Sequence, residues 1–375
     1  MKKVLIAYHY ISHYRIPIFN LLSKNDKVEY TILAGEKTDI KIKTADIELS
    51  KIPPKNGGIR WEIISNYWFL KYFLIQPSLL KKCFTKKYDT IIFLGTMYYL
   101  TTWMGAVIAR LRGKKVIFWS HGYIKDEKNI KGFIRFVFYS LANEILVYGQ
   151  RAKDILIAKG FPESKVSLIY NSLNYDKQKQ IRNNIIQDLK KEEFFKNDLP
   201  IFGFIGRLTK QKKIDLLLLA LAEINKDAPK SNLLIIGDGD QIEILKQKSN
   251  ELGLNDFVCF YGPCYDEEKI FKLITLLKVV VSPGEVGLTA IHSLTFGVPV
   301  VTHNRFDMQM PEYEAIIEGD TGSFFDYNNP IPSLVEKINE WIYLPEDNLI
   351  KEKCFRIIDE YYNPYTQNKI FDNKV

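Results

Sequence analysis

The chain has 375 residues, of which 46% are hydrophobic, and its 52 Lys and Arg exceed its 44 Asp and Glu to give a formal net charge of +8. Because a single hydrophobic core stops growing at about 250 to 300 residues, this length predicts two domains. No continuous run of about 18 apolar residues occurs, which argues against a membrane-spanning helix.

Charge is divided unevenly along the chain. Residues 1–180 contain 30 Lys and Arg against 14 Asp and Glu, a balance of +16, whereas residues 181–375 contain 22 against 30, a balance of −8. A basic first half suits an anionic partner such as a nucleic acid, a membrane surface or a lipid diphosphate.

The amino terminus and the cysteines indicate a compartment. Residues 1–8 lead directly into a first apolar strand rather than a cleavable signal peptide. The four cysteines show no C-x-x-C spacing, so we expect reduced thiols. Both features predict a cytoplasmic protein.

Continuous apolar runs alternate with helical patterns through the chain. Such runs are typical of parallel strands that helices cover on both faces. In the first half the predicted strands are Val4–Ala7, Val28–Leu33, Thr90–Leu94, Lys115–Trp119, Glu144–Tyr148 and Val166–Ile169. In the second half they are Ile201–Ile205, Asn232–Ile236, Val258–Tyr261, Val279–Ser282, Val298–Thr302 and Gly322–Phe325. The predicted fold class is α/β, with two doubly wound, Rossmann-like domains.

Aromatic residues and lysines are interleaved ahead of the third predicted strand. The segments Asn66–Ile75 and Leu79–Lys87 have the pattern of helices that lie on a membrane surface, and a second basic group lies between Arg110 and Lys115. The alternative is that the aromatic residues belong to the core and the lysines are merely solvated. We expect this basic, aromatic first domain to contact the inner face of an anionic membrane, and we expect no nucleic acid partner.

The segment from Ile201 to Leu221 joins a strand to a helix through a polar turn. Gly206 permits a tight turn, Arg207 can contact two phosphate oxygens, and Lys212 can add a point charge. The helix N-terminus that follows the turn also favours an anion. The turn therefore predicts a phosphate site, with a solvated basic loop as the alternative.

A second turn of this kind follows the strand Val279–Ser282. It leads through Pro283 into a predicted helix from about Leu288 to Phe296, which ends at Gly297 before the next strand. In open α/β sheets ligands bind outside the carboxyl ends of the strands. The two turns together predict a nucleotide diphosphate site.

These motifs resemble those of the retaining family 4 glycosyltransferases, which have the two-domain GT-B fold. The residues that carry the resemblance are Gly206–Leu208, Gln211–Lys212, Ile235–Gly239, Ser282–Pro283, Gly287–Leu288, Gly297–Val301 and Asp320–Gly322, with Trp119–Gly122 and Val166–Asn174 in the first half. The resemblance implies two Rossmann-like domains that face a central cleft. Residues 1–180 would bind the acceptor, 181–199 would form a linker, and 200–345 would bind the nucleotide sugar. The helical segment 346–375 would pack back on the first domain.

The chain departs from the family pattern at two positions. Family members carry two glutamates eight residues apart around the Gly-Leu step, one for the donor sugar and one for the ribose, but Gly284 and His292 stand at those positions here. Glu285 lies one residue beyond the first position and can reach the sugar from a shifted turn. A neutral His292 can hydrogen-bond the ribose, or it can be a half-buried structural residue. The departure bears on the identity of the donor and on activity itself.

The resemblance also implies the other donor contacts. They are Gly206, Gly239, Gly262, Pro263, Gly284, Val286, Gly287, Leu288 and Thr289. Relatives contact the base through the main chain near Gly262, so no side chain names it, and we expect UDP with GDP as the alternative. No Asp-x-Asp motif stands near the donor motifs, so no metal and no other cofactor is expected to be required.

Catalysis is expected to rest on stabilising the departing diphosphate. Arg207, Lys212 and the amides from Gly287 to Thr289 are suited to that task. The resemblance implies retention at the anomeric carbon and assigns Glu285 to the donor sugar. Two further acidic residues, Glu312 and Glu314, are assigned only a donor-side role.

Histidines follow several predicted strands. His121 is expected to be catalytic, because by the resemblance it approaches the donor sugar near the reacting carbon; a helix-capping loop histidine is the alternative. Many relatives have a glycine-rich loop after the first strand, but this chain has side chains there, which are expected to bind the acceptor. They are His9, Tyr10, His13 and Arg15. Arg15 would contact an acceptor phosphate, although Tyr14 and Arg15 can equally begin a helix capped by Ser12.

The predicted activity is that of a bacterial hexosyl- or N-acetylhexosaminyltransferase. Its saccharide acceptor is expected to be lipid-linked or to belong to cell-surface polysaccharide or lipopolysaccharide synthesis. Three alternatives remain open. A nicotinamide-dependent oxidoreductase is disfavoured because no G-x-G-x-x-G follows the first strand. A sugar-nucleotide epimerase would share the diphosphate site but needs no basic aromatic face. A catalytically silent binding subunit is the alternative that the missing glutamates support.

Overall fold

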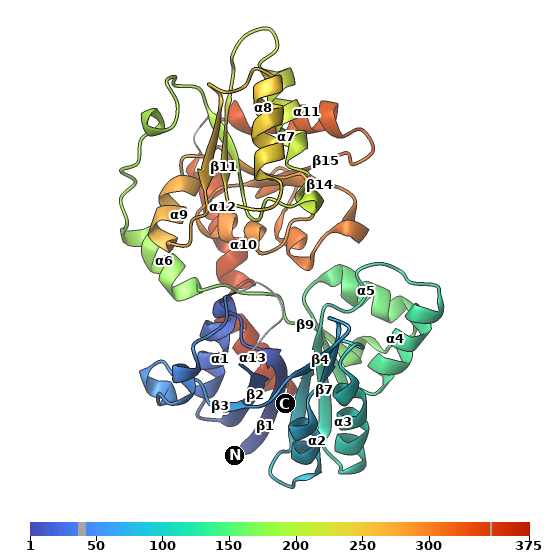
Figure 1. Cartoon of the computed structure of the whole chain (residues 1–375). Coiled ribbons are helices and arrows are strands. Elements are labelled where there is room, and N and C mark those ends of the chain that lie inside the picture. Colours follow the sequence, from blue (N-terminus) through green and yellow to red (C-terminus); the bar gives the residue numbers. More distant parts are fainter. Residues whose placement is uncertain (37–42, 346) are drawn as a thin grey trace. The chain divides into compact units, whose positions relative to one another are not determined.

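The computed structural model describes residues 1–36, 43–345 and 347–375. It divides into two compact units, one of Met1–Asn174 with Tyr362–Val375 and one of Tyr175–Tyr361 (Figure 1). Each unit is built on one large parallel sheet flanked by helices. The predicted fold class, α/β with two Rossmann-like domains, is confirmed.

The first unit contains a seven-stranded parallel sheet in the order β3-β2-β1-β6-β7-β8-β9. Its strands are β1 (Lys2–Tyr10), β2 (Val28–Gly35), β3 (Trp61–Ile63), β6 (Thr90–Leu94), β7 (Lys115–Ser120), β8 (Glu144–Val147) and β9 (Val166–Leu168). Its helices are α1 (Ile16–Ser23), α2 (Pro77–Phe84), α3 (Leu100–Leu111), α4 (Ile130–Ser140), α5 (Gln150–Ala158) and α13 (Pro364–Lys374). The strand order reverses at β1, so ligands are expected at the carboxyl ends of β1 and β6.

The end of the chain belongs to the first unit. Lys2 Nζ donates a hydrogen bond to the main-chain oxygen of Val375 at 2.8 Å, and the Phe371 ring lies 5.1 Å from that of Trp119. Of the segment 346–375, only α13 is placed in this unit, whereas α12 (Asn348–Glu360) lies in the second.

The segment Asn66–Ile75 is a β-hairpin, so the helical pattern predicted there is wrong. Strands β4 (Tyr67–Phe69) and β5 (Phe73–Ile75) pair antiparallel, and Leu70 and Lys71 between them are left-handed, with φ of 48° and 63°. Leu74 is buried and Trp68 is half-buried, while Tyr67, Phe69 and Ile75 are exposed. Three-residue strands are too short to show a period of two in the sequence, which is why the interleaving resembled a helix.

The second unit contains a six-stranded parallel sheet in the order β12-β11-β10-β13-β14-β15. Its strands are β10 (Ile201–Ile205), β11 (Asn232–Ile236), β12 (Val258–Gly262), β13 (Val279–Ser282), β14 (Val300–His303) and β15 (Gly322–Phe325). Its other helices are α6 (Tyr175–Asn184), α7 (Asp215–Ile224), α8 (Ile242–Glu251), α9 (Glu267–Ile274), α10 (Leu288–Thr295) and α11 (Pro330–Ile342). The strand order reverses between β10 and β13, which are hydrogen-bonded neighbours. The two turns identified from the sequence therefore emerge side by side.

Candidate active site

Glycines allow two loops of the second unit to meet at the carboxyl ends of β10 and β11. A Cβ added to Gly237 would lie 1.9 Å from the oxygen of Gly206, and one added to Gly239 would lie 2.2 Å from the oxygen of Leu208. The amide of Leu208 donates to the oxygen of Asp238 at 2.9 Å. Only residues without a side chain allow two main chains to approach this closely, so the turn after β11 supports the turn after β10.

Gly284 joins the turn after β13 to the same assembly. Its amide donates a hydrogen bond to the oxygen of Lys212 at 3.1 Å, and an added Cβ would lie 2.1 Å from the oxygen of Gln211. No larger residue fits at position 284 unless the main chain moves. A glutamate therefore does not fit at this position while the two loops pack as they do.

Lys212 and Glu285 form the polar centre of these loops. Lys212 Nζ donates to the main-chain oxygen of Glu285 at 2.8 Å and lies 3.5 Å from Oε1 of its carboxylate. Burial lowers the pKa of Lys212, the charge of Glu285 opposes this effect, and the nearby Arg207 adds to the lowering. Arg207 itself is exposed. The structure therefore brings three residues selected from the sequence into one electrostatic environment.

Glu312 adds a second carboxylate to this environment. Its side chain is buried, at 3% exposure, in the short 3-10 helix Pro311–Ala315. Its Oε2 lies 4.0 Å from the point where a Cβ on Gly287 would stand, and its charge raises the pKa of Lys212. Glu314 is half-buried in the same 3-10 helix.

The first turn of α10 is fixed to the end of β10. Thr289 Oγ1 donates to the main-chain oxygen of Ile205 at 3.3 Å, and α10 begins directly after Gly287. Val286 is fully buried and Leu288 is half-buried. The first amides of a helix have no partner within it and carry partial positive charge, which suits an anion.

Gln309, which no sequence pattern singled out, holds the turn after β13. Its Oε1 accepts from the amide of Val286 at 2.7 Å, while its Nε2 donates to Thr302 Oγ1 at 2.9 Å and to the oxygen of His303 at 3.1 Å. Thr302 Oγ1 in turn donates to the oxygen of Ser282 at 2.8 Å. These contacts connect the ends of β13 and β14.

His292 is paired with a carboxylate that sequence reasoning missed. Its Nε2 lies 3.0 Å from Oε2 of Glu267 on α9, and the same oxygen accepts from Gln178 Nε2 at 3.2 Å. Burial opposes ionisation of Glu267, but the hydrogen bonds from His292 and Gln178 act against it, and the pKa of Glu267 lies below its usual range. Glu267 is 25 residues away from His292 along the chain, so no local motif could reveal the pair.

The turn after β12 carries the two remaining predicted donor residues. Gly262 has a φ of 89°, and its oxygen accepts from the amide of Gly237 at 2.9 Å. Pro263, directly after it, is exposed. The main chain of Gly262 is therefore aligned with the loop assembly through Gly237.

In the first unit, a buried arginine lies beside two histidines at the strand ends. Arg15 is 2% exposed, donates from Nη2 to Tyr148 Oη at 2.7 Å, and stacks over Trp119 at 4.9 Å. Burial, with a further contribution from the charge of Arg15, lowers the pKa of His9 to about 3. Desolvation of the imidazole, with a further contribution from the charge of Arg15, also lowers the pKa of His121 to about 4, although the residue as a whole is exposed. Both imidazoles are neutral at pH 7.

The other two predicted acceptor residues differ in position. Tyr10 is buried, with its ring centroid 3.8 Å from that of His9. His13 is exposed, and its Nδ1 lies 3.2 Å from the oxygen of Lys43. His9, Arg15 and His121 are therefore brought together, and His13 lies apart from them at the surface.

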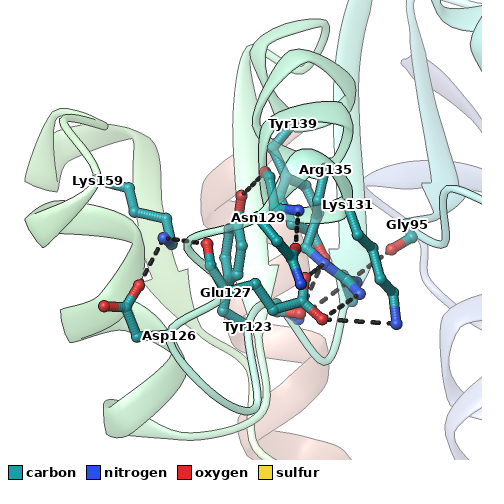
Figure 2. A network of polar contacts seen from close by, with 12 residues as sticks. Gly95, Tyr123, Asp126, Glu127, Asn129, Lys131, Arg135, Tyr139 and Lys159 are labelled. Carbon is teal, nitrogen blue, oxygen red and sulfur yellow. Dashed lines mark hydrogen bonds and ion pairs between the residues drawn. The ribbon is translucent and has the colours of Figure 1, made fainter.

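A polar network holds the loop that follows β7 (Figure 2). Tyr139 Oη on α4 lies 2.7 Å from Ser120 Oγ, and Arg135 Nε on the same helix donates to Glu127 Oε2 at 2.9 Å. Lys159 Nζ donates to the main-chain oxygen of Glu127 at 3.0 Å. The loop beside His121 is thus fixed by α4 and by the residue that follows α5.

Metal-ligating side chains are not clustered in the part of the chain that the structure describes. No group of three or more His, Cys, Asp or Glu residues within it is arranged to hold a metal ion. Likewise, none of the described helices is long and apolar enough to cross a bilayer.

Part of the second unit is similar in sequence to a known protein family. The family model of glycosyl transferases group 1 matches residues 185–355, which lie within the second unit. Residues 185–355 are therefore similar in sequence to glycosyl transferases group 1. The uncharacterized glycosyltransferase MJ1069 of Methanocaldococcus jannaschii is 24% identical over 359 residues, which cover 88% of this chain and 86% of that protein.

Solved structures match the whole length of the chain, and therefore both units. Anabaena Alr3699/HepE in complex with UDP has a TM-score of 0.69 at 18% identity, covering 100% of this chain and 99% of that chain. The lipopolysaccharide outer core galactosyltransferase WaaB has a TM-score of 0.72 at 16% identity, covering 100% of both chains. The fold is GT-B, and together with the match of residues 185–355 to glycosyl transferases group 1 it supports a glycosyltransferase.

Proposed function

We propose that the protein transfers a sugar from a nucleotide diphosphate sugar to a saccharide acceptor, with UDP as the favoured nucleotide. The proposal rests on the approach of Lys212 Nζ to Glu285 within the residues that match glycosyl transferases group 1, beside Arg207 and the first turn of α10. Two cations and helix amides together suit a diphosphate. UDP is favoured because the Anabaena protein of the same fold forms a complex with UDP.

Departure of the nucleotide is the step that these cations would assist. Cleavage of the bond between the anomeric carbon and the phosphate oxygen leaves negative charge on the diphosphate. Arg207 and Lys212 would neutralise that charge, and Lys212 is already oriented by its hydrogen bond to the oxygen of Glu285. A bound diphosphate would raise the pKa of Lys212, because an added anion opposes the effect of burial.

Glu285 is assigned to the hydroxyl groups of the donor sugar. Its side chain is 37% exposed, and its carboxylate is within 3.5 Å of Lys212 at one oxygen, so it can accept further hydrogen bonds. We assign retention at the anomeric carbon, with an oxygen of the donor phosphate taking the proton of the acceptor hydroxyl. His121 is assigned to the reacting sugar as a neutral imidazole, consistent with its lowered pKa.

His292 and Glu267 are assigned to the ribose. A proton on His292 Nε2 that is donated to Glu267 leaves Nδ1 as an acceptor for a ribose hydroxyl group. A hydrogen-bonded carboxylate commonly fixes the tautomer and orientation of an imidazole in this way. The base would meet the main chain at Gly262.

The acceptor is proposed to be a lipid-linked or cell-surface saccharide, bound by the first unit with His9 and Arg15 at its strand ends. We further propose peripheral association with the inner face of the cytoplasmic membrane. The basic balance of residues 1–180 supports this association, as do the aromatic residues Tyr67, Phe69 and Tyr72 of the hairpin, which are 58, 59 and 69% exposed.

Thermal unfolding of the purified protein with UDP, GDP, their sugar conjugates and NADH tests the donor assignment. A ligand at a hundredfold its dissociation constant adds about 2.7 kcal/mol of stability to the unit that binds it. We expect a shift with UDP that is lost in Lys212→Ala. A shift with NADH alone would overturn the proposal.

A catalytically silent binding subunit is the second candidate, because Gly284 excludes a glutamate from its usual position. Nuclear magnetic resonance of UDP-sugars with the protein and a panel of saccharides distinguishes the candidates. A new glycosidic bond with the anomeric configuration of the donor supports the proposal, and UDP binding without any turnover supports the silent subunit. Conversion of one UDP-sugar into another without an acceptor would identify an epimerase instead.

A further inference from the structure

Helix α3 is apolar on its outer side as well as its inner side. Its first ten residues, 100–109, contain no charged side chain. The outer side consists of Leu100, Met104, Val107 and Leu111, which are 40, 55, 44 and 82% exposed. The inner side packs through small residues that include Gly105, Ala106 and Ala109. A surface helix of a soluble protein normally carries polar residues on the side away from the core.

Helix α4 repeats this arrangement. Its exposed residues are Ile130, Phe133, Ile134 and Val137, at 81, 68, 43 and 40% exposure. Their spacing of three and four residues places them on one side of the helix, opposite the buried Gly132 and Tyr139. These four side chains thus form a continuous apolar stripe on the side of α4 that is directed away from the sheet.

The two helices lie next to each other at one edge of the first unit (Figure 1). The ring centroids of Trp103 and Phe138 are 4.9 Å apart, and Arg110 Nη1 donates to the main-chain oxygens of Ser140 and Leu141 at 3.2 and 3.3 Å. Because each stripe is opposite the residues that pack inward, both stripes face outward together. We call these eight exposed side chains the α3–α4 apolar face.

Positive charge borders the α3–α4 apolar face. The exposed basic residues are Arg110, Arg112, Lys125, Lys128 and Lys131. Two carboxylates lie nearby, and each is shared by two cations. Glu127 lies 2.9 Å from Arg135 and 3.6 Å from Lys131. Asp126 lies 2.6 Å from Lys159 and 3.8 Å from Lys128, so positive charge remains in excess at this border. The centres of protein interfaces are depleted of lysine, whereas lysines beside apolar and aromatic side chains suit an anionic bilayer surface.

We propose that the α3–α4 apolar face docks on the surface of an anionic lipid bilayer. The eight side chains enter the boundary between headgroups and acyl chains, and the bordering lysines and arginines contact the lipid phosphates. This inference deepens the proposed membrane association by naming the surface, and it does not depend on sugar transfer. Since Tyr139 and Arg135 of α4 hold the loop beside His121, docking orients that loop relative to the membrane (Figure 2).

Flotation of the full chain with vesicles tests the docking. The probes are vesicles of phosphatidylcholine alone and of phosphatidylcholine with about a third phosphatidylglycerol, in low and high salt. We expect flotation with the anionic vesicles that weakens with salt. The triple variant L111S/I130S/F133S should reduce the partition coefficient about tenfold or more, because three exposed apolar anchors are lost. These positions are 82, 81 and 68% exposed, so folding should be preserved.

A matched control and a second readout complete the experiment. The variant I244S/Y265S removes exposed apolar residues of the second unit, 59 and 86% exposed, and should float as the wild type does. In Phe133→Trp, tryptophan emission should shift to shorter wavelength with anionic vesicles. Equal flotation of the triple variant, or no flotation of the wild type, would overturn the inference. So would a wild-type dimer that becomes a monomer in the triple variant without vesicle binding.

The failure of docking is separable from the failure of the proposed function. UDP-dependent thermal stabilisation and donor turnover with a soluble saccharide use no residue of the α3–α4 apolar face. Both should therefore be unchanged in the triple variant, whatever the vesicles show.

Discussion

Lys212 Nζ lies 2.8 Å from the main-chain oxygen of Glu285, although 73 residues separate them in the chain. The contact exists because β10 and β13 are neighbours, so the turns that follow them meet. The hydrogen bond orients the ammonium group and leaves its remaining hydrogens for another acceptor. Two distant sequence motifs thus become one site.

Replacing Lys212 with alanine should lower kcat/KM for the nucleotide sugar. The loss should correspond to about 2 to 4 kcal/mol of transition-state stabilisation, which is the cost of losing one preorganised donor at a developing anion. Steady-state kinetics measures the loss. Lys210→Ala is the matched control, since Lys210 is an exposed lysine of the same turn, and it should stay near the wild-type rate. Equal rates for both variants would refute the diphosphate assignment.

Gly284→Ala should destabilise the second unit by about 3 kcal/mol, because the new Cβ would lie 2.1 Å from the oxygen of Gln211 and the main chain must move. Gly319→Ala is the control: nothing lies within 4 Å of its Cβ, and its φ of 75° costs only about 1 kcal/mol. Denaturant unfolding compares the two. A cost for Gly284→Ala no greater than that of Gly319→Ala would show that the loops are not closely packed in solution.

Gln309→Leu should cost about 2 to 3 kcal/mol of stability, since it leaves the buried amide of Val286 without its acceptor. Hydrogen exchange at the Val286 amide should accelerate at the same time. The comparison is Gln247→Leu on α8, an exposed residue whose side chain donates to Glu251, which should stay within about 0.5 kcal/mol. Unchanged exchange at Val286 would contradict the role assigned to Gln309.

Arg15→Met should raise the pKa of His9 and His121, because removing a nearby positive charge makes protonation easier. Both values should remain below 6.5, since burial is the larger cause of the lowering. Imidazole titration by nuclear magnetic resonance measures the change. His303 in the second unit, whose pKa burial and Lys213 lower to about 4, serves as the internal reference and should not move.

Stability should fall as pH drops from about 6.5 towards 4, in part because of His303. Its pKa is about 4 when folded and 6.5 when unfolded, so the unfolded chain binds the proton first. The contribution of neutral His303 to the free energy of unfolding is fully present above pH 6.5. At pH 4 the free energy of unfolding is lower by about 3 kcal/mol for this reason. His303→Asn, which can still accept from the amide of Arg305, should show a shallower loss on acidification. An identical pH profile would exclude this contribution.

Most strands of the two parallel sheets were predictable because they are continuous apolar runs, and the most central of them are buried on both faces; the short, partly exposed β3 was missed. Val4–Ala7 and Val279–Ser282 lie within or at observed strands, and the glycines and cations at their ends mark the turns. The hairpin at Asn66–Ile75 was not predictable. Its strands are three residues long, and two of its side chains, Trp68 and Leu74, are selected by contacts with the loop before α3.

The sequence by itself determined the α/β class, the positions of the two polar turns and the cationic side chains that they carry, because strand burial and turn geometry are local properties of the chain. Only the tertiary structure decided which side chains meet: Glu267 with His292, Gln309 with Val286, and Gly284 with the main chain at Gln211. Such pairings depend on strand order and on helix packing across tens of residues, which no local pattern records.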